Sequence, residues 1–168
     1  MHNKVVYHAA KALEDVGFVT LRINFRGVGA SSGAYDEGRG EADDARVGLA
    51  GLLADQPAAR DVLLAGFSFG ASIALRVGCA EARVRRLISI GTPAGWLSPE
   101  TLAGCAKPIG FVHGAVDDVT PLAALQALLA ATRRGAATQL QVIPAAGHFF
   151  SGQFEALRAA VAAAAELT

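Results

Sequence analysis

The chain has 168 residues, 52% hydrophobic and 18% charged, and a single domain of this size can bury a core without disulfides or metals. Its 15 Lys and Arg balance its 15 Asp and Glu, so there is no basic face to favour a nucleic-acid or anionic-membrane partner. There is neither an apolar secretory signal nor a run of about 20 apolar residues. We therefore expect one cytoplasmic domain over residues 1–168.

Helical and strand-like patterns alternate along the chain, beginning with a helix. Helices are indicated by apolar residues three, four and seven positions apart, and strands by short runs of alternating or continuous apolar residues. In chain order we expect a helix around residues 6–13, a strand over 18–24, a helix around 45–53, a strand over 61–67, a helix around 73–77, strands over 84–90 and 108–113, a helix around 122–129, a strand over 139–143 and a helix from 154 onwards.

Strands separated by helices are typical of a parallel sheet covered on both faces, so the fold class is α/β: a three-layer α/β/α sandwich with about five strands. Residues 91–107 form only a short insert, irregular or short-helical, which excludes a large cap over the sheet. The opening helix is unusual, because a crossover helix normally follows an earlier strand. We expect the strand over 18–24 to have an unpaired edge, through which the protein could form homo-oligomers.

The sharpest motif is Gly66-Phe67-Ser68-Phe69-Gly70, which fits G-x-S-x-G where a buried strand passes into a helix. Such a turn raises a serine hydroxyl above the sheet edge, and we expect bulk at either Gly66 or Gly70 to collide with backbone. Ser68 is therefore a candidate nucleophile, and the Phe69 N–H a candidate oxyanion donor. The alternative is a small-residue turn that only permits close packing.

A serine nucleophile needs a base and an orienting carboxylate. His148 follows the last strand, at the edge that presents Ser68, and is the preferred base; His113 is the second choice, and His2 and His8 lie in the first helix. Asp117, after the strand over 108–113, is the preferred acid. Asp118 is the alternative, and both could instead simply begin the next helix.

These motifs resemble those of the α/β-hydrolase superfamily, over nearly the whole chain. The segment GFSFG is similar to its nucleophile elbow, HGAVDDVTP to its acid loop and AGHFF to its histidine loop, while RGVGASSGAYDEGRGEADD resembles small prokaryotic carboxylesterase-like and dienelactone-hydrolase-like members. The resemblance implies a Ser68–His148–Asp117 triad that cleaves small carboxylic esters, with thioesters as a further possibility, through an acyl-enzyme. It implies no metal and no organic cofactor.

The resemblance departs from the family at its front, where members have earlier strands and a loop that supplies a second oxyanion donor. We expect an N-terminally truncated member, with a catalytic rate reduced by about 10² to 10³ if that donor is lost. The alternative function is a weak or inactive remnant that acts as an interaction protein.

Four further groups of residues carry weaker signals. Trp96, Leu97 and Phe149 are expected in loops near Ser68, as acyl-pocket lining or as plain packing. Gly27-Val28-Gly29 lacks the spacing of a dinucleotide loop. Cys79 and Cys105 are expected to be buried small hydrophobes. Acidic residues that we expect to be solvated, and not to form a cation site, are Asp36, Glu37, Glu41, Asp43 and Asp44.

Overall fold

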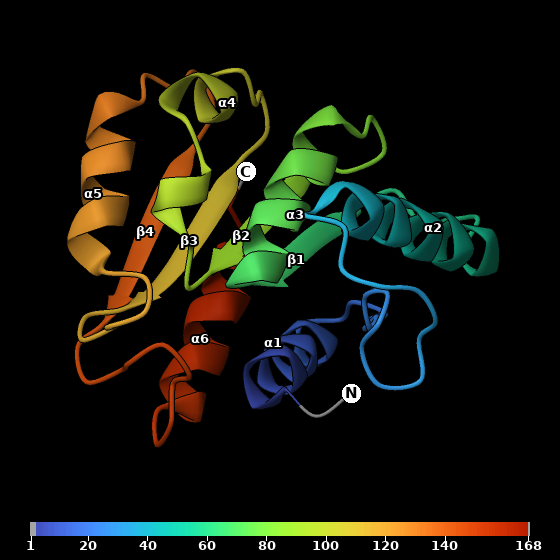
Figure 1. The fold of residues 1–168 in the computed structure, drawn as a ribbon, viewed down its shortest axis with the longest axis horizontal. Coiled ribbons are helices and arrows are strands. Elements are labelled where there is room, and N and C mark those ends of the chain that lie inside the picture. Colours follow the sequence, from blue (N-terminus) through green and yellow to red (C-terminus); the bar gives the residue numbers. More distant parts are fainter. Residues whose placement is uncertain (1–2, 168) are drawn as a thin grey trace.

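The computed structural model describes residues 3–167 as a parallel sheet between two helical layers (Figure 1). The strands are β1 (Leu63–Phe67), β2 (Arg86–Ile90), β3 (Ile109–Gly114) and β4 (Thr138–Ile143), and they lie side by side in that order. The helices are α1 (Lys4–Asp15), α2 (Arg39–Asp55), α3 (Phe69–Ala80), α4 (Pro99–Ala103), α5 (Leu122–Ala131) and α6 (Phe154–Ala165), with a single 3₁₀ turn, η1 (Ala94–Trp96).

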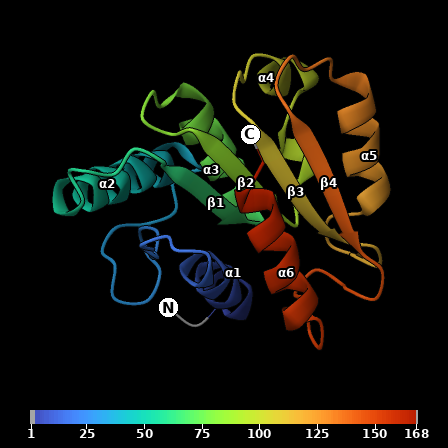
Figure 2. The same ribbon diagram turned by 180° about the vertical axis from the view of Figure 1, so that it is seen from behind.

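Each face of the sheet has its own apolar core, because successive strand residues point to opposite faces. On one face, Ile88, Ile90 and Val112 pack against α1 and α6, which come from opposite ends of the chain and lie side by side (Figure 2). On the other face, Leu87 and Phe111 pack against α3, α4 and α5. The three-layer α/β/α expectation is confirmed.

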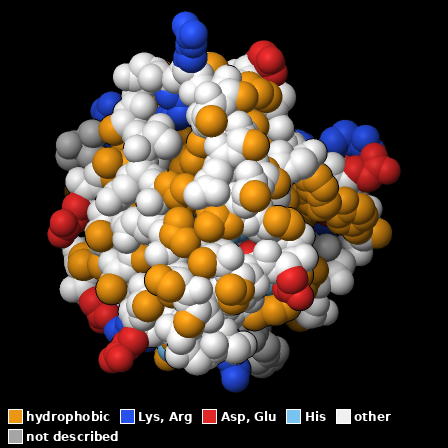
Figure 3. All heavy atoms as spheres, turned by 90° about the vertical axis from the view of Figure 1, so that its left-hand side faces the viewer, with side chains coloured by type: hydrophobic (Ala, Val, Ile, Leu, Met, Phe, Trp, Pro, Cys, Tyr) orange, Lys and Arg blue, Asp and Glu red, His pale blue; other side chains and the backbone are white. Residues whose placement is uncertain are grey.

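The helix α5 has no charged residue. Figure 3 shows the side of the molecule that carries it: hydrophobic side chains are spread over the middle of this side, and charged groups lie mostly toward its outline. Within the part of the chain that the structure describes, no helix is long and apolar enough to cross a membrane.

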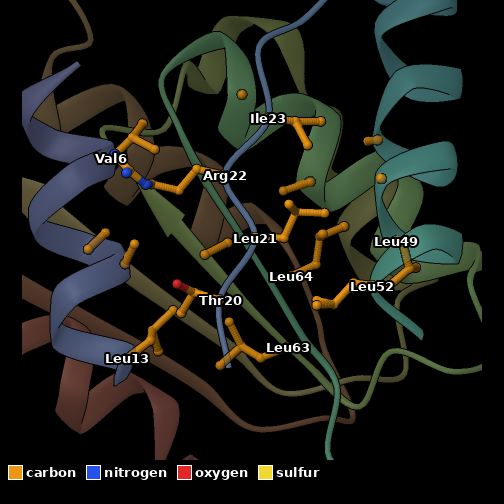
Figure 4. A pocket seen from close by; sticks show the side chains of 18 of the residues that line it. Val6, Leu13, Thr20, Leu21, Arg22, Ile23, Leu49, Leu52, Leu63 and Leu64 are labelled. Atoms are coloured by element: carbon orange, nitrogen blue, oxygen red, sulfur yellow. The ribbon is translucent and has the colours of Figure 1, made fainter. Parts of the chain in front are cut away.

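The predicted strand over residues 18–24 is wrong. This segment is extended, and Leu21 and Ile23 point away from Thr20 and Arg22 as the alternation predicts (Figure 4), but it joins no sheet. Among the described residues no strand lies against it, and its Val19 and Leu21 side chains are exposed. The sheet therefore has four strands, because an extended segment becomes a strand only by pairing.

An apolar groove of about 880 Å³ separates this segment from β1. Leu21 and Ile23 face Leu64 of β1 and Leu49 and Leu52 of α2 across it (Figure 4). On its other edge β1 pairs with β2, so the groove borders the free edge of the described sheet.

Cys79 and Cys105 form a disulfide with their Cα atoms 5.0 Å apart, which corrects the expectation of two separate buried thiols. The bond joins the end of α3 to the segment before β3. Sequence spacing alone could not show this proximity, since it depends on how the crossovers bring the two segments together. Disulfides are rare in cytosolic proteins, so this bond does not support the cytoplasmic location. That location stays a prediction.

Candidate active site

Ser68 occupies the turn between β1 and α3 in a strained conformation, with φ 52° and ψ −120°. Its backbone N–H donates to the Ile90 carbonyl at 2.8 Å, which fixes the turn to β2. A Cβ on Gly66 would lie 2.0 Å from the Gly70 carbonyl oxygen, so only glycine fits where the first turn of α3 crosses the strand. The backbone thus holds the Ser68 hydroxyl at the carboxyl end of the sheet.

The expectation for Gly70 is wrong. A Cβ there would meet only the Phe25 ring, at 3.9 Å, which is an ordinary van der Waals contact. Gly70 is the second residue of α3 and its open side faces Phe25, whereas Gly66 lies beneath the helix. Of the two glycines, only Gly66 is required by the space at the turn.

His148 lies in the loop after β4 and reaches back to Ser68. Its Nε2 is 2.9 Å from the Ser68 Oγ, and its side chain is only 4% exposed. The imidazole packs beside the Phe67 ring, with 4.9 Å between centroids. Buried against β1, the ring is held in position to exchange a proton with the serine hydroxyl.

Asp117 lies in the loop after β3, with its Oδ2 2.8 Å from His148 Nδ1. Its Oδ1 accepts the backbone N–H groups of Thr120 at 2.7 Å and Val119 at 3.0 Å, and its Oδ2 accepts the Thr120 hydroxyl at 2.8 Å. Burial would raise the pKa of Asp117, but these hydrogen bonds and His148 together hold it below its ordinary value. An ionised carboxylate only accepts, so Nδ1 carries the proton and Nε2 is free to accept the serine proton.

The loops that carry Asp117 and His148 are joined by backbone contacts. The Val116 N–H donates to the Ala146 carbonyl at 3.1 Å, and a Cβ on Gly114 would lie 2.2 Å from the same oxygen. The two loops can approach this closely because residue 114 is glycine. Asp117 and His148 are therefore positioned by one shared contact between the ends of neighbouring strands.

Thr120 is a residue of this site that sequence reasoning missed. It gives Asp117 two hydrogen bonds, and its Oγ1 is also 3.3 Å from His148 Nδ1. The usable signal was the spacing Asp117-x-x-Thr120, since an Asp side chain commonly accepts N–H groups two and three residues ahead of it.

The other candidate acids and bases within the described residues make no hydrogen bond to Ser68 or His148. Asp118 is exposed and makes no contact with His148. His113 is fully buried, with its Nε2 2.6 Å from the Thr120 carbonyl oxygen and 3.6 Å from Asp117 Oδ2, whereas the imidazole at hydrogen-bond distance from Ser68 Oγ is that of His148. His8 stacks on Phe154 with ring centroids 4.3 Å apart, and His2 lies outside the described residues.

Backbone donors face the space above Ser68. The helix α3 begins at Phe69, and the Phe69 and Gly70 N–H groups find no acceptor in residues 3–167. An N–H at a helix N-terminus carries partial positive charge, which suits a developing oxyanion.

The residues expected to line a pocket are divided. The Trp96 ring lies 5.9 Å from that of Phe69, and the Phe149 ring 5.1 Å from that of His148, so both border the candidate site. Leu97 instead packs against the core between α3 and α5.

The expectation that the acidic residues of the glycine-rich loop are solvated is wrong for Glu41, and Asp44 is half-buried with a structural partner. Glu41 is 1% exposed and accepts the N–H groups of Asp36 and Gly38, while Asp44 pairs with Arg26 at 2.8 Å. Hydrogen bonding to Arg26, more than any other contact, lowers the pKa of Asp44. Within residues 3–167, no three His, Cys, Asp or Glu side chains are grouped as a metal site would need.

Comparisons with known proteins agree with the α/β fold. An uncharacterized protein of Rickettsia prowazekii is 35% identical over 167 residues, which cover 96% of this chain and 70% of the relative. A solved structure described as an alpha-beta serine hydrolase homologue from Coxiella burnetii is 36% identical with a TM-score of 0.86, over 97% of this chain and 76% of that one. The solved protein XC6422 of Xanthomonas campestris, described as an a/b serine hydrolase without lid, is 36% identical with a TM-score of 0.86, over 98% and 73%. No protein-family model matches the chain.

Proposed function

This chain belongs to the α/β-hydrolase superfamily, and from that premise we propose that it is a serine hydrolase that cleaves small carboxylic esters through an acyl-enzyme. The observation that carries the proposal is the hydrogen-bonded series Ser68 Oγ, His148 Nε2, His148 Nδ1 and Asp117 Oδ2, with successive contacts of 2.9 Å and 2.8 Å.

The first half of the reaction forms the acyl-enzyme. Ser68 Oγ attacks the ester carbonyl carbon while its proton passes to His148 Nε2. The negative charge on the carbonyl oxygen is stabilised by the N–H of Phe69 at the start of α3. When the carbonyl re-forms, the bond to the alcohol oxygen breaks, and that oxygen takes the proton from His148.

The second half releases the acid. Water attacks the acyl carbon and gives a proton to His148, which then returns it to Ser68 Oγ as the acyl–oxygen bond breaks. Asp117 stays ionised throughout, because its hydrogen bonds hold its pKa low, and it stabilises the imidazolium that forms twice per turnover. No metal or cofactor enters these steps.

Access to Ser68 favours small esters and agrees with the lidless description of the Xanthomonas relative. Between β2 and β3 there are only the short η1 and α4, and Trp96 on this insert is exposed. Thioesters are within reach of the same chemistry, because a thiolate leaves more readily than an alkoxide.

The proposal is tested with p-nitrophenyl acetate, by stopped-flow detection of p-nitrophenolate from the wild type and Ser68→Ala. We expect the wild type to turn over this ester, with a burst of about one equivalent of p-nitrophenolate per enzyme when deacylation is the slower step. For Ser68→Ala we expect kcat to fall by about 10⁶. Equal rates for the two proteins would contradict the proposal. Unchanged thermal unfolding of Ser68→Ala is the control for its fold.

A second candidate function is a non-catalytic interaction protein that forms homo-oligomers. The specific observation in its favour is the free edge of β1 beside an extended, unpaired segment. Under this alternative, sedimentation would reveal oligomers and Ser68→Ala would associate and function as the wild type does. A monomer with an essential Ser68 would exclude it.

A further inference from the structure

Aromatic side chains gather around Ser68 far more than elsewhere in the molecule. The chain has eleven Phe, Tyr and Trp residues. Six of these border the candidate site through ring contacts with one another or with His148: Phe25, Tyr35, Phe67, Phe69, Trp96 and Phe149. They come from four separate segments, so the fold, rather than one local sequence, brings them together.

Three of these rings are exposed although exposure of large apolar surface is unfavourable. Tyr35 is 65% exposed, Trp96 60% and Phe149 59%. Exposed apolar groups that converge on one place are typical of a binding surface, whereas single ones need no explanation. Rings here would lose their water contact when a substrate covers them.

The reaction geometry assigns the two ends of the ester to different rings. The leaving oxygen must receive its proton from His148 Nε2, so the alcohol lies on the His148 side, next to Phe149. The acyl group is attached to the carbonyl carbon that Ser68 attacks, and we place it on the side away from His148, toward Phe69. There the Phe69 ring has Tyr35 at 5.8 Å and Trp96 at 5.9 Å, between centroids, with Phe25 at 5.6 Å.

A hollow without free charge lies next to the Phe69 ring, one residue along the chain from Ser68. The hollow has a volume of about 410 Å³ and lies between Phe25 and Tyr35. The two charged residues that line it are already partnered: Arg26 is bound to Asp44, and Glu41 accepts two backbone N–H groups. An acyl group with its own charge would find no counter-ion there.

We propose that the acyl group of the substrate is a flat, uncharged aromatic ring, held by the edges and faces of Tyr35, Phe69 and Trp96. The inference rests on the proposed function and narrows its substrate class to esters of aromatic carboxylic acids. Edge-to-face and offset contacts favour an aromatic ring over a saturated ring of the same size, because the π-system's quadrupole adds to area burial.

The test compares two esters with the same leaving group, p-nitrophenyl benzoate and p-nitrophenyl cyclohexanecarboxylate. Each kcat/KM is measured for the wild type, Trp96→Leu and Tyr35→Leu. We expect each variant to lose about three- to ten-fold for benzoate and less than two-fold for cyclohexanecarboxylate. Leucine keeps apolar bulk, so the difference between the two esters isolates the aromatic contact.

Two controls complete the design. Tyr7→Leu removes a half-exposed ring on α1, away from Ser68, and should leave both rates unchanged. Phe149 lies on the leaving-group side. Because the two esters have the same leaving group, Phe149→Leu should change kcat/KM for both by the same factor. Turnover in which Trp96→Leu and Tyr35→Leu affect both esters equally would overturn the inference and leave the proposed function intact. A wild type that hydrolyses p-nitrophenyl acetate but neither ring ester would overturn the inference alone, whereas a wild type that hydrolyses none of the three esters would contradict the proposed function as well.

Discussion

The two edges of β1 differ in how completely they are satisfied. On the edge toward β2, the backbone groups of the even-numbered residues form hydrogen bonds with the neighbouring strand. At the two ends of this edge, the Val62 carbonyl accepts the Arg85 N–H, and the Ser68 N–H donates to the Ile90 carbonyl. The odd-numbered N–H and C=O groups, from Leu63 to Phe67, point the other way because strand hydrogen bonds alternate. There they face the apolar groove, with no backbone partner among the described residues.

The paired edge of β1 positions the candidate catalytic residues, whereas the free edge borders the groove, which Ser68 and Phe69 also line. Ser68, Asp117 and His148 follow β1, β3 and β4, and depend on the paired side of the sheet. The segment over residues 18–25 joins no sheet and is held by contacts with helices, among them the packing of Phe25 on Phe69 of α3. The candidate site is thus built at the ends of hydrogen-bonded strands, which suits the precise geometry that catalysis requires.

The largest effect expected on the paired side comes from Asp117→Asn. The amide can donate to His148 Nδ1 and so favours the wrong tautomer, and we expect kcat to fall by about 10⁴. The measurement is steady-state ester hydrolysis, with Asp118→Asn as the matched control because Asp118 is exposed. Equal losses in the two variants would show that Asp117 has no special role.

The turn after β1 is tested by Gly66→Ala and Gly70→Ala. The first places a Cβ 2.0 Å from a backbone oxygen, and we expect a loss of about 3 kcal/mol or more in the free energy of unfolding. The second meets only an ordinary contact and should be tolerated within about 1 kcal/mol. Urea unfolding measures both, and similar values for the pair would refute the account of the turn.

The packed core and the groove beside β1 are compared directly by Leu75→Ala and Leu21→Ala. Leu75 on α3 is 1% exposed, so its truncation should cost about 2–5 kcal/mol of unfolding free energy. Leu21 borders the groove and is 50% exposed, so the same change should cost about 0.5 kcal/mol. A large cost at Leu21 would mean that the groove is closed in solution.

The smallest effect is on acid stability. The pKa of Asp117 is lowered in the folded protein, so its carboxylate stabilises the fold above the ordinary carboxyl pKa. That contribution is lost as the pH falls through the lowered value. Thermal unfolding between about pH 6 and pH 2 should therefore show a shallower acid decline for Asp117→Asn than for the wild type. Parallel declines would contradict this.

The sequence predicts those site residues whose positions follow from a local motif at the end of a strand, and it misses those whose roles depend on the path of a loop. Ser68, Asp117 and His148 could be placed together because parallel strands end at one edge, so local motifs were enough. The role of Thr120 could not be predicted because it depends on the path of the loop after β3. The space for a side chain at Gly70 depends on the direction of one Cα–Cβ bond, which a sequence motif does not give.

For the fold, the helices and the paired strands follow from periodicity and short apolar runs. The segment over residues 18–24 has a strand's alternation, but pairing is a property of its neighbours. The Cys79–Cys105 bond likewise needs the spatial approach of two distant segments. Local pattern therefore predicts elements better than it predicts their partners.

The central claim is that His148 and Asp117 activate Ser68, and a fluorophosphonate probe tests it most directly. Wild-type protein should gain one adduct, mapped to Ser68 by peptide mass spectrometry, while Ser68→Ala gains none and His148→Ala reacts far more slowly. An unlabelled wild type, under conditions where a reference serine hydrolase is fully modified, would contradict the account.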